Sequence, residues 1–151
     1  MLVRTAEESF VKGKTALADG RAREALAFFE AAIQLEKKYG VPRPQARYLS
    51  HYGLCLGMLT PRRYEGIRFC REATLLEEYN ADLHLNLGRA LLTAERRREA
   101  YKALRRGLRL QPSHSGIMYE LHHMGIRKRP MLPFLARDHA LNVFLGRLRV
   151  S

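Results

Sequence analysis

Three stretches of the sequence repeat one pattern of small and apolar residues, and this repetition limits the possible folds more than any other feature. In each stretch four residues follow one another at steps of four, three and three, which places them on one face of an α-helix. The three sets are Ala25, Phe29, Ala32 and Leu35; Gly66, Cys70, Ala73 and Leu76; and Ala100, Leu104, Gly107 and Leu110. They lie 41 and 34 residues apart, a period that predicts stacked structural repeats.

A glycine precedes each set by twelve or thirteen residues, at Gly13, Gly53 and Gly88. Apolar residues at helical spacing surround each glycine, so we expect one helix around the glycine and a second helix around the set that follows. Small residues let two helix backbones approach closely. The sequence therefore predicts three antiparallel helix pairs, with Gly88 close to Ala100 in the third pair, and an all-α fold.

Residues typical of helix ends lie between these predicted helices. Thr5–Glu8 has the sequence of a capping box, which predicts the start of the first helix. Asp19–Gly20 predicts a turn within the first pair, and Thr60–Pro61 predicts the N-cap and first residue of the fourth helix. Pro112 predicts the end of the third pair.

With these residues the chain resembles the tetratricopeptide-repeat family, and the third copy carries the resemblance best. Its residues at the signature places are Leu87, Gly88, Leu91, Ala100, Leu104, Gly107 and Pro112. The resemblance implies a right-handed helical-hairpin solenoid with three repeats at about 6–39, 46–80 and 81–114. We expect a capping helix at 115–124 to complete this domain, residues 1–124, because the open end of a repeat stack must be covered. Residues 125–151 are expected to form a basic tail.

Charge and cysteine content limit the partners and the compartment. The chain has 27 basic and 15 acidic residues, a net charge of +12 with neutral histidine, and most of the excess lies in residues 81–151. No apolar run approaches the ~20 residues of a membrane span, and no secretory signal is visible. Cys55 and Cys70 are too few for a disulfide framework. We expect a cytoplasmic protein with both cysteines as small core residues, the alternative being a redox pair.

Motifs for enzyme chemistry are missing from the sequence. It has no phosphate-binding glycine loop, no nucleophile elbow and no cysteine pair at zinc spacing. His122 and His123 are neighbours that would point about 100° apart on a helix, which does not suit a shared metal ion. We expect no catalytic activity, no metal site and no cofactor.

The resemblance implies that function lies in a concave groove lined by the first helix of each pair. The residues that it assigns to this groove are Phe10, Val11, Lys14, Leu17, Arg47, His51, Leu54, Met58, Asp82, Leu85, Asn86, Arg89, Leu92, Tyr119 and His123. Apolar residues alternate there with cations, so we expect a protein-interaction adaptor or chaperone that binds a partner peptide with apolar and acidic groups. In size and repeat number the chain is similar to the three-repeat chaperones of type III secretion translocators.

One subfamily of these repeats clamps the C-terminal carboxylate of heat-shock chaperones with lysine, asparagine and arginine side chains. The corresponding positions in this chain hold Phe10, Lys14, His51, Asp82 and Asn86. All three cations and both asparagines of that pattern are therefore replaced, and we expect no carboxylate clamp.

A second hypothesis is polyanion binding, to RNA, DNA or an anionic membrane, through the basic C-terminal half. Its candidate residues are Arg96, Arg97, Arg98, Lys102, Arg105, Arg106, Arg109, Arg127, Lys128 and Arg129. The tail adds an apolar stripe of Leu141, Phe144, Leu145 and Leu148 on a predicted amphipathic helix. We expect this stripe to pack on the chain's own repeats, including the groove, because an exposed stripe favours aggregation; a partner or a membrane surface are the alternatives.

Overall fold

The computed structural model describes residues 2–125. Over this range the chain forms seven α-helices and no strand, which confirms the predicted all-α class. The helices are α1 (Leu2–Ala18), α2 (Ala22–Lys38), α3 (Ala46–Leu59), α4 (Arg63–Leu76), α5 (Ala81–Thr93), α6 (Arg97–Leu110) and α7 (Ser115–His123). None of these helices is long and apolar enough to cross a membrane.

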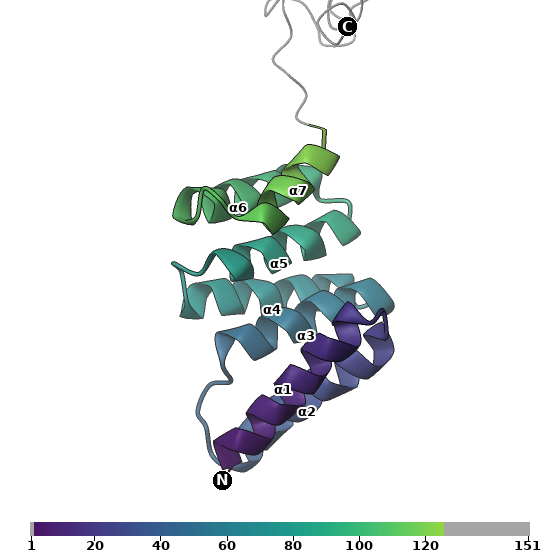
Figure 1. The fold of residues 1–151 in the computed structure, drawn as a ribbon, viewed down its shortest axis with the longest axis vertical. Coiled ribbons are helices and arrows are strands. Elements are labelled where there is room, and N and C mark those ends of the chain that lie inside the picture. The colour runs from purple at the N-terminus through teal and green to yellow at the C-terminus, as the bar shows by residue number, and fades with distance from the viewer. Residues whose placement is uncertain (1, 126–151) are drawn as a thin grey trace, which may run out of the picture.

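The helices are arranged as stacked hairpins (Figure 1). The most extensive contacts join α1 to α2, α3 to α4, and α5 to α6. Neighbouring hairpins meet through contacts of α3 with α2 and α5, and of α4 with α5, while α7 covers the end of the third hairpin. The predicted solenoid of helical hairpins is therefore confirmed. The predicted tail lies outside the described residues.

Two of the predicted helix starts are wrong. The first helix begins at Leu2, so Thr5 lies inside it and is not an N-cap. Thr60 ends α3, where its hydroxyl donates to the carbonyl of Leu56, and α4 begins at Arg63. In both cases a residue typical of an N-cap lies elsewhere near a helix end: Thr5 is inside the first turn of α1, and Thr60 is the C-cap of α3. The turn at Asp19–Gly20 is confirmed, and Gly20 has a φ of +76°, which favours glycine.

Glycines lie at the close contacts within the hairpins, as predicted. A Cβ atom on Gly13 would come within 2.6 Å of the Phe29 ring. On Gly53 it would lie 2.5 Å from the carbonyl oxygen of Gly66. On Gly88 it would meet the Leu104 side chain at 2.6 Å. The atoms nearest to this position belong to Leu104, and the closeness of Gly88 to Ala100 stays a prediction.

Cys55 and Cys70 are free thiols buried in the second hairpin. The Cys70 thiol donates to the carbonyl of Ser50 at 3.4 Å. Burial raises the pKa of Cys55 to about 11 and that of Cys70 to about 12, so both stay protonated near neutral pH. Because the thiolate is the reactive form, these properties agree with small core residues and disfavour a redox pair.

Candidate functional site

A hollow of about 470 Å³ opens between the first helices of the three hairpins and α7. Its lining residues are Leu17 from α1, Leu54 and Met58 from α3, Arg89, Leu92 and Thr93 from α5, and Glu120 from α7. Four helices that are far apart in the sequence therefore contribute to one concave site. We refer to these seven residues as the hollow.

Apolar side chains form much of the wall of the hollow, and they differ in accessibility. Leu54 is only 4% exposed and packs in the core with Leu87 and Leu91, so it forms the floor. Met58 is 52% exposed. Because methionine is flexible and polarisable, it adapts to apolar groups of different shape. Met58 is thus the apolar wall residue that a ligand can reach most easily.

The two ionised residues of the hollow are paired with each other. Nε of Arg89 donates to Oε1 of Glu120 at 2.7 Å, which joins α5 to α7. The Glu120 side chain is largely buried, with 16% of it exposed. The Arg89 charge is therefore neutralised within the protein, and the hollow presents mostly apolar surface together with the Thr93 hydroxyl.

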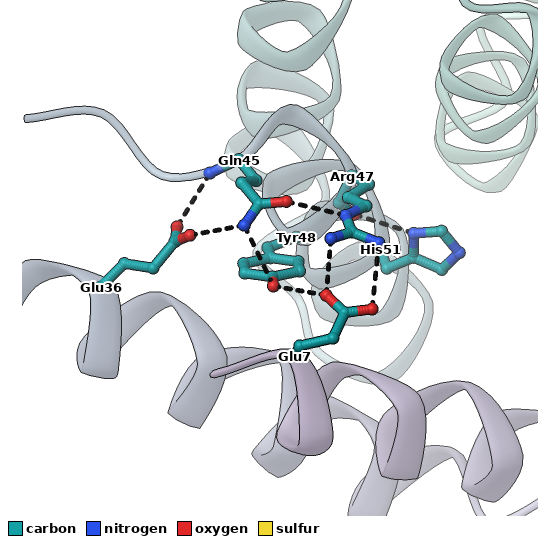
Figure 2. Close-up of polar contacts among 6 residues, drawn as sticks. All are labelled: Glu7, Glu36, Gln45, Arg47, Tyr48 and His51. Atoms are coloured by element: carbon teal, nitrogen blue, oxygen red, sulfur yellow. Dashed lines mark hydrogen bonds and ion pairs between the residues drawn. The ribbon is translucent and has the colours of Figure 1, made fainter. Parts of the chain in front are cut away.

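A polar network joins the first hairpin to α3 (Figure 2). Glu7 of α1 accepts hydrogen bonds from Arg47 at 3.1 Å and from the Tyr48 hydroxyl at 2.8 Å. Glu36 of α2 accepts from the backbone N–H and the side-chain amide of Gln45, both at 2.9 Å. Burial and the hydrogen bond to Glu7 raise the pKa of Tyr48. Arg47, a predicted groove cation, is therefore also neutralised by a carboxylate of its own chain.

His51 lies beside this network, between aromatic rings. Its ring centroid is 5.1 Å from that of Phe10 and 5.3 Å from that of Phe29. Burial lowers the pKa of His51, and the neighbouring Lys14 and Arg47 charges lower it further. The neutral ring is favoured, and Nδ1, 2.8 Å from the Arg47 carbonyl oxygen, is then the protonated nitrogen that donates to it.

The predicted groove residues fall into four groups. Leu17, Leu54, Met58, Arg89 and Leu92 line the hollow. Phe10, Leu85 and Asn86 are buried, and the Asn86 amide donates to the Ser50 hydroxyl at 3.0 Å. The exposed ones are Val11, Lys14, Asp82, Tyr119 and His123, while Arg47 and His51 are half-buried.

Two residues of the hollow, Thr93 and Glu120, were not predicted. Thr93 lies one helical turn after Arg89, and its hydroxyl donates to the Arg89 carbonyl. Glu120 directly follows the predicted residue Tyr119, whose ring lies 4.0 Å from that of His123. Helical spacing could have suggested Thr93, whereas the partner of Arg89 depends on how α7 packs.

The predicted polyanion residues are also divided. Arg96 pairs with Glu99 at 2.6 Å, Arg106 with Glu78 at 3.6 Å, and Arg97 donates to the Met124 carbonyl at 2.7 Å. The other four within the described part of the chain lie on the exposed side of α6: Arg98, Lys102, Arg105 and Arg109. Arg127, Lys128 and Arg129 lie outside the described residues. Between residues 2 and 125, no group of three or more potential ligand residues could hold a metal ion.

The stacked hairpins and the hollow between their first helices define an α-solenoid with a concave candidate binding site. Residues 81–114 match the family model described as tetratricopeptide repeat. The chain is thus a helical solenoid that carries a tetratricopeptide repeat and has the fold of tetratricopeptide-repeat domains. No curated protein matches the sequence.

Solved structures of such domains share this fold at low sequence identity. The Arabidopsis OM64 TPR domain is 21% identical with a TM-score of 0.65, and the match covers 82% of this chain and 97% of that one. The first TPR domain of human RPAP3 is 17% identical with a TM-score of 0.65, covering 81% and 91%. The first TPR of Spaghetti (RPAP3), bound to the HSP90 peptide SRMEEVD, is 17% identical with a TM-score of 0.63, covering 80% and 90%.

Proposed function

We propose that this chain is a non-catalytic protein-interaction module, an adaptor or chaperone, that holds a segment of a partner protein in the hollow. The observation that carries the proposal is the apolar hollow itself, built from the first helices of all three hairpins and from α7. Ligand-binding sites on proteins are usually concave and mostly apolar, with a few polar groups. A structural neighbour, the first TPR of Spaghetti, is bound to a peptide, which supports a peptide as the ligand.

The charges around the hollow indicate what kind of segment fits. Arg47 and Arg89 already have carboxylate partners in Glu7 and Glu120. Lys14 has no acidic partner among the described residues; its ammonium lies 5.6 Å from the centroid of the Phe10 ring. We therefore infer that an apolar side chain of the partner enters the hollow, and that an acidic group at the α1 end meets Lys14. Two buried free thiols agree with a reducing compartment such as the cytoplasm.

The test compares two methionines with the same exposed fraction. Met58 lines the hollow and Met118 lies on α7 outside it, and each is 52% exposed. We expect Met58→Glu to lose a partner that the parent captures from native cell extract at 0.5 M salt, since a carboxylate would enter the apolar hollow. The control Met118→Glu should retain that partner. Equal capture by both variants would contradict binding in the hollow.

Leu54 is unsuitable for this test because its substitution would also disrupt the core. The melting temperatures of Met58→Glu and Met118→Glu should both stay close to that of the parent, since both side chains are half-exposed. A loss of partner without a loss of stability then reports on the site itself.

A separate expectation follows from the predicted packing of the tail on the repeats. If the apolar stripe of the tail competes for the hollow, Phe144→Glu in the full chain should increase partner affinity, because it removes an apolar side chain from the competitor. Unchanged affinity would mean that the stripe does not occupy the hollow. This outcome would leave the expected effect of Met58→Glu as it is.

A further inference from the structure

Four cations form a straight line along the exposed side of α6. Arg98, Lys102, Arg105 and Arg109 follow one another at steps of four, three and four residues. With 3.6 residues per turn, these steps keep the four side chains on one face, over a length of about 16 Å. All four are exposed. We refer to them as the α6 stripe.

Two acidic residues near the α6 stripe pair with cations outside it, and Glu95, three residues before Arg98, forms no ion pair with the stripe. Glu99 pairs with both Arg96 and Arg71, each at 2.6 Å. Glu78 pairs with Arg106. Within residues 5–125, no ion pair or side-chain hydrogen bond involves a residue of the stripe.

Like charges at these spacings repel one another along a helix. Residues three and four apart on a helix are neighbours, and like-charge pairs at those distances destabilise it. The stripe contains three such pairs in succession, Arg98–Lys102, Lys102–Arg105 and Arg105–Arg109. A bound row of anions would remove this repulsion. The repulsion therefore favours the binding of a polyanion at the stripe.

The surroundings of the stripe favour a nucleic acid over a lipid surface. Ala100 and Leu104, on the apolar face of α6, are completely buried in the hairpin, so they are not available to enter a membrane interface. One exposed tyrosine flanks the stripe: Tyr101 lies three residues after Arg98 and four before Arg105, next to both on the helix surface. Aromatic side chains beside cations suit single-stranded nucleic acid, whose bases stack on them.

We propose that the α6 stripe binds a single nucleic-acid strand through its phosphates, with Tyr101 beside a base. This site differs from the hollow, which α6 does not line. Binding at the stripe and partner binding in the hollow can therefore be tested independently of each other. The contacts are to the backbone and to base faces, so we expect little dependence on nucleotide sequence.

The test measures binding of the full chain to a fluorescein-labelled 20-nucleotide poly(U) by anisotropy between 50 and 300 mM salt. The stripe variant carries Arg98→Gln, Lys102→Gln, Arg105→Gln and Arg109→Gln. The control variant, with the same change in net charge, carries Lys12→Gln, Arg23→Gln, Lys37→Gln and Lys38→Gln, which are exposed positions of the first hairpin. A poly(dT) strand and vesicles with 30% phosphatidylserine serve as further probes.

We expect the stripe variant to bind poly(U) at least about tenfold more weakly than the parent at 0.1 M salt. Its slope of log affinity against log salt should be lower by about 3, since each phosphate contact on a single strand contributes about 0.7. The control should retain the parent's slope. Tyr101→Leu alone should weaken binding by about threefold or more, because stacking is lost while the charge is unchanged.

Several results would overturn the proposal. Equal losses in the stripe and control variants would mean that net charge alone attracts the strand. Binding of the parent to the anionic vesicles without binding to either strand would assign the stripe to a membrane, and absence of all binding would leave it a solvated helix face. Should the fourfold variant unfold, the two double variants Arg98→Gln/Lys102→Gln and Arg105→Gln/Arg109→Gln must each show part of the loss.

Discussion

The second and third hairpins carry glycine at the same place in the first helix but pack it in different ways. In the α3–α4 hairpin, Gly53 faces backbone atoms, the carbonyl oxygen of Gly66 and the amide nitrogen of Cys70. In the α5–α6 hairpin, Gly88 faces the side chain of Leu104. The two helices of the second hairpin therefore meet backbone to backbone, whereas a side chain separates them in the third.

This difference shows that one spacing of small residues permits two kinds of contact. A side chain can change its rotamer when a neighbour grows, but a helix backbone can move only as a whole. We therefore expect the second hairpin to be the less tolerant of the two. Four measurements test this difference between the hairpins, and they are ordered by the size of the change that we expect.

The largest effect is expected for Gly53→Ala. The new Cβ atom would lie 2.5 Å from the Gly66 carbonyl oxygen and 2.8 Å from Cβ of Phe69, so α3 and α4 must separate. We expect a loss of about 2 to 3 kcal/mol in the free energy of unfolding, measured in urea, despite the higher helix propensity of alanine. A loss below ~1 kcal/mol would contradict the close backbone contact.

A smaller effect is expected for Gly88→Ala, about 1 kcal/mol, because the Leu104 side chain is the obstacle. A double-mutant cycle with Leu104→Ala tests the cause. In that background Gly88→Ala should cost nothing or stabilise the protein, since the obstacle has been removed. The matched cycle of Gly53→Ala with Phe69→Ala should show no such rescue, because the backbone contact with Gly66 remains. Rescue in both cycles would remove the distinction between the hairpins.

Gly57→Ala is the control within α3, four residues after Gly53. A Cβ atom there would meet nothing closer than 3.8 Å. We expect this substitution to raise the free energy of unfolding by about 0.5 to 1 kcal/mol, because alanine replaces glycine inside a helix without a clash. A destabilised Gly57→Ala would mean that any added side chain disturbs α3, whatever its surroundings.

The smallest effect concerns pH, since each of the two hairpins holds a neutral histidine. Burial lowers the pKa of His51, and the charges of Lys14 and Arg47 lower it further while Asp82 raises it. Burial also lowers the pKa of His84, with the Arg106 charge lowering it further and Glu78 raising it.

Below the unfolded-state pKa of about 6.5, the unfolded chain then binds more protons than the folded chain. The contribution of the two histidines to stability should therefore be constant above that pH and should fall as the pH drops from there towards the lower folded-state pKa values. Urea midpoints at pH 7.5 and pH 5.5 measure the effect, and His51→Gln or His84→Gln should each reduce it. A midpoint that is unchanged or higher at pH 5.5 would contradict the lowered pKa values.

The fold was predictable from the sequence because it depends on local spacing. Steps of four, three and three residues predict helices, and glycine before each set predicts close helix pairs. Which atoms come closest to each glycine depends on how far the two helices slide along each other, and the spacing does not give that distance. The closest atoms are those of Gly66 for Gly53 and those of Leu104 for Gly88.

The site was predictable in part. The family resemblance placed Met58 and Arg89 among the groove residues, and both line the hollow. The ion pairs could not be inferred, because Glu7 lies 40 residues before Arg47 and Glu120 lies 31 residues after Arg89. The capping-box motif at Thr5–Glu8 was misleading because α1 begins before it, at Leu2.

The carboxylate of Glu36 has a consequence for the segment between the first two hairpins. From α2, this carboxylate accepts a hydrogen bond from the backbone N–H of Gln45, the residue just before α3. This contact stabilises the start of α3 and does not involve residues 39–44. Five of those six residues are exposed. This connection is therefore a suitable place to insert a foreign domain, or to open the chain for circular permutation, while α3 keeps its starting point.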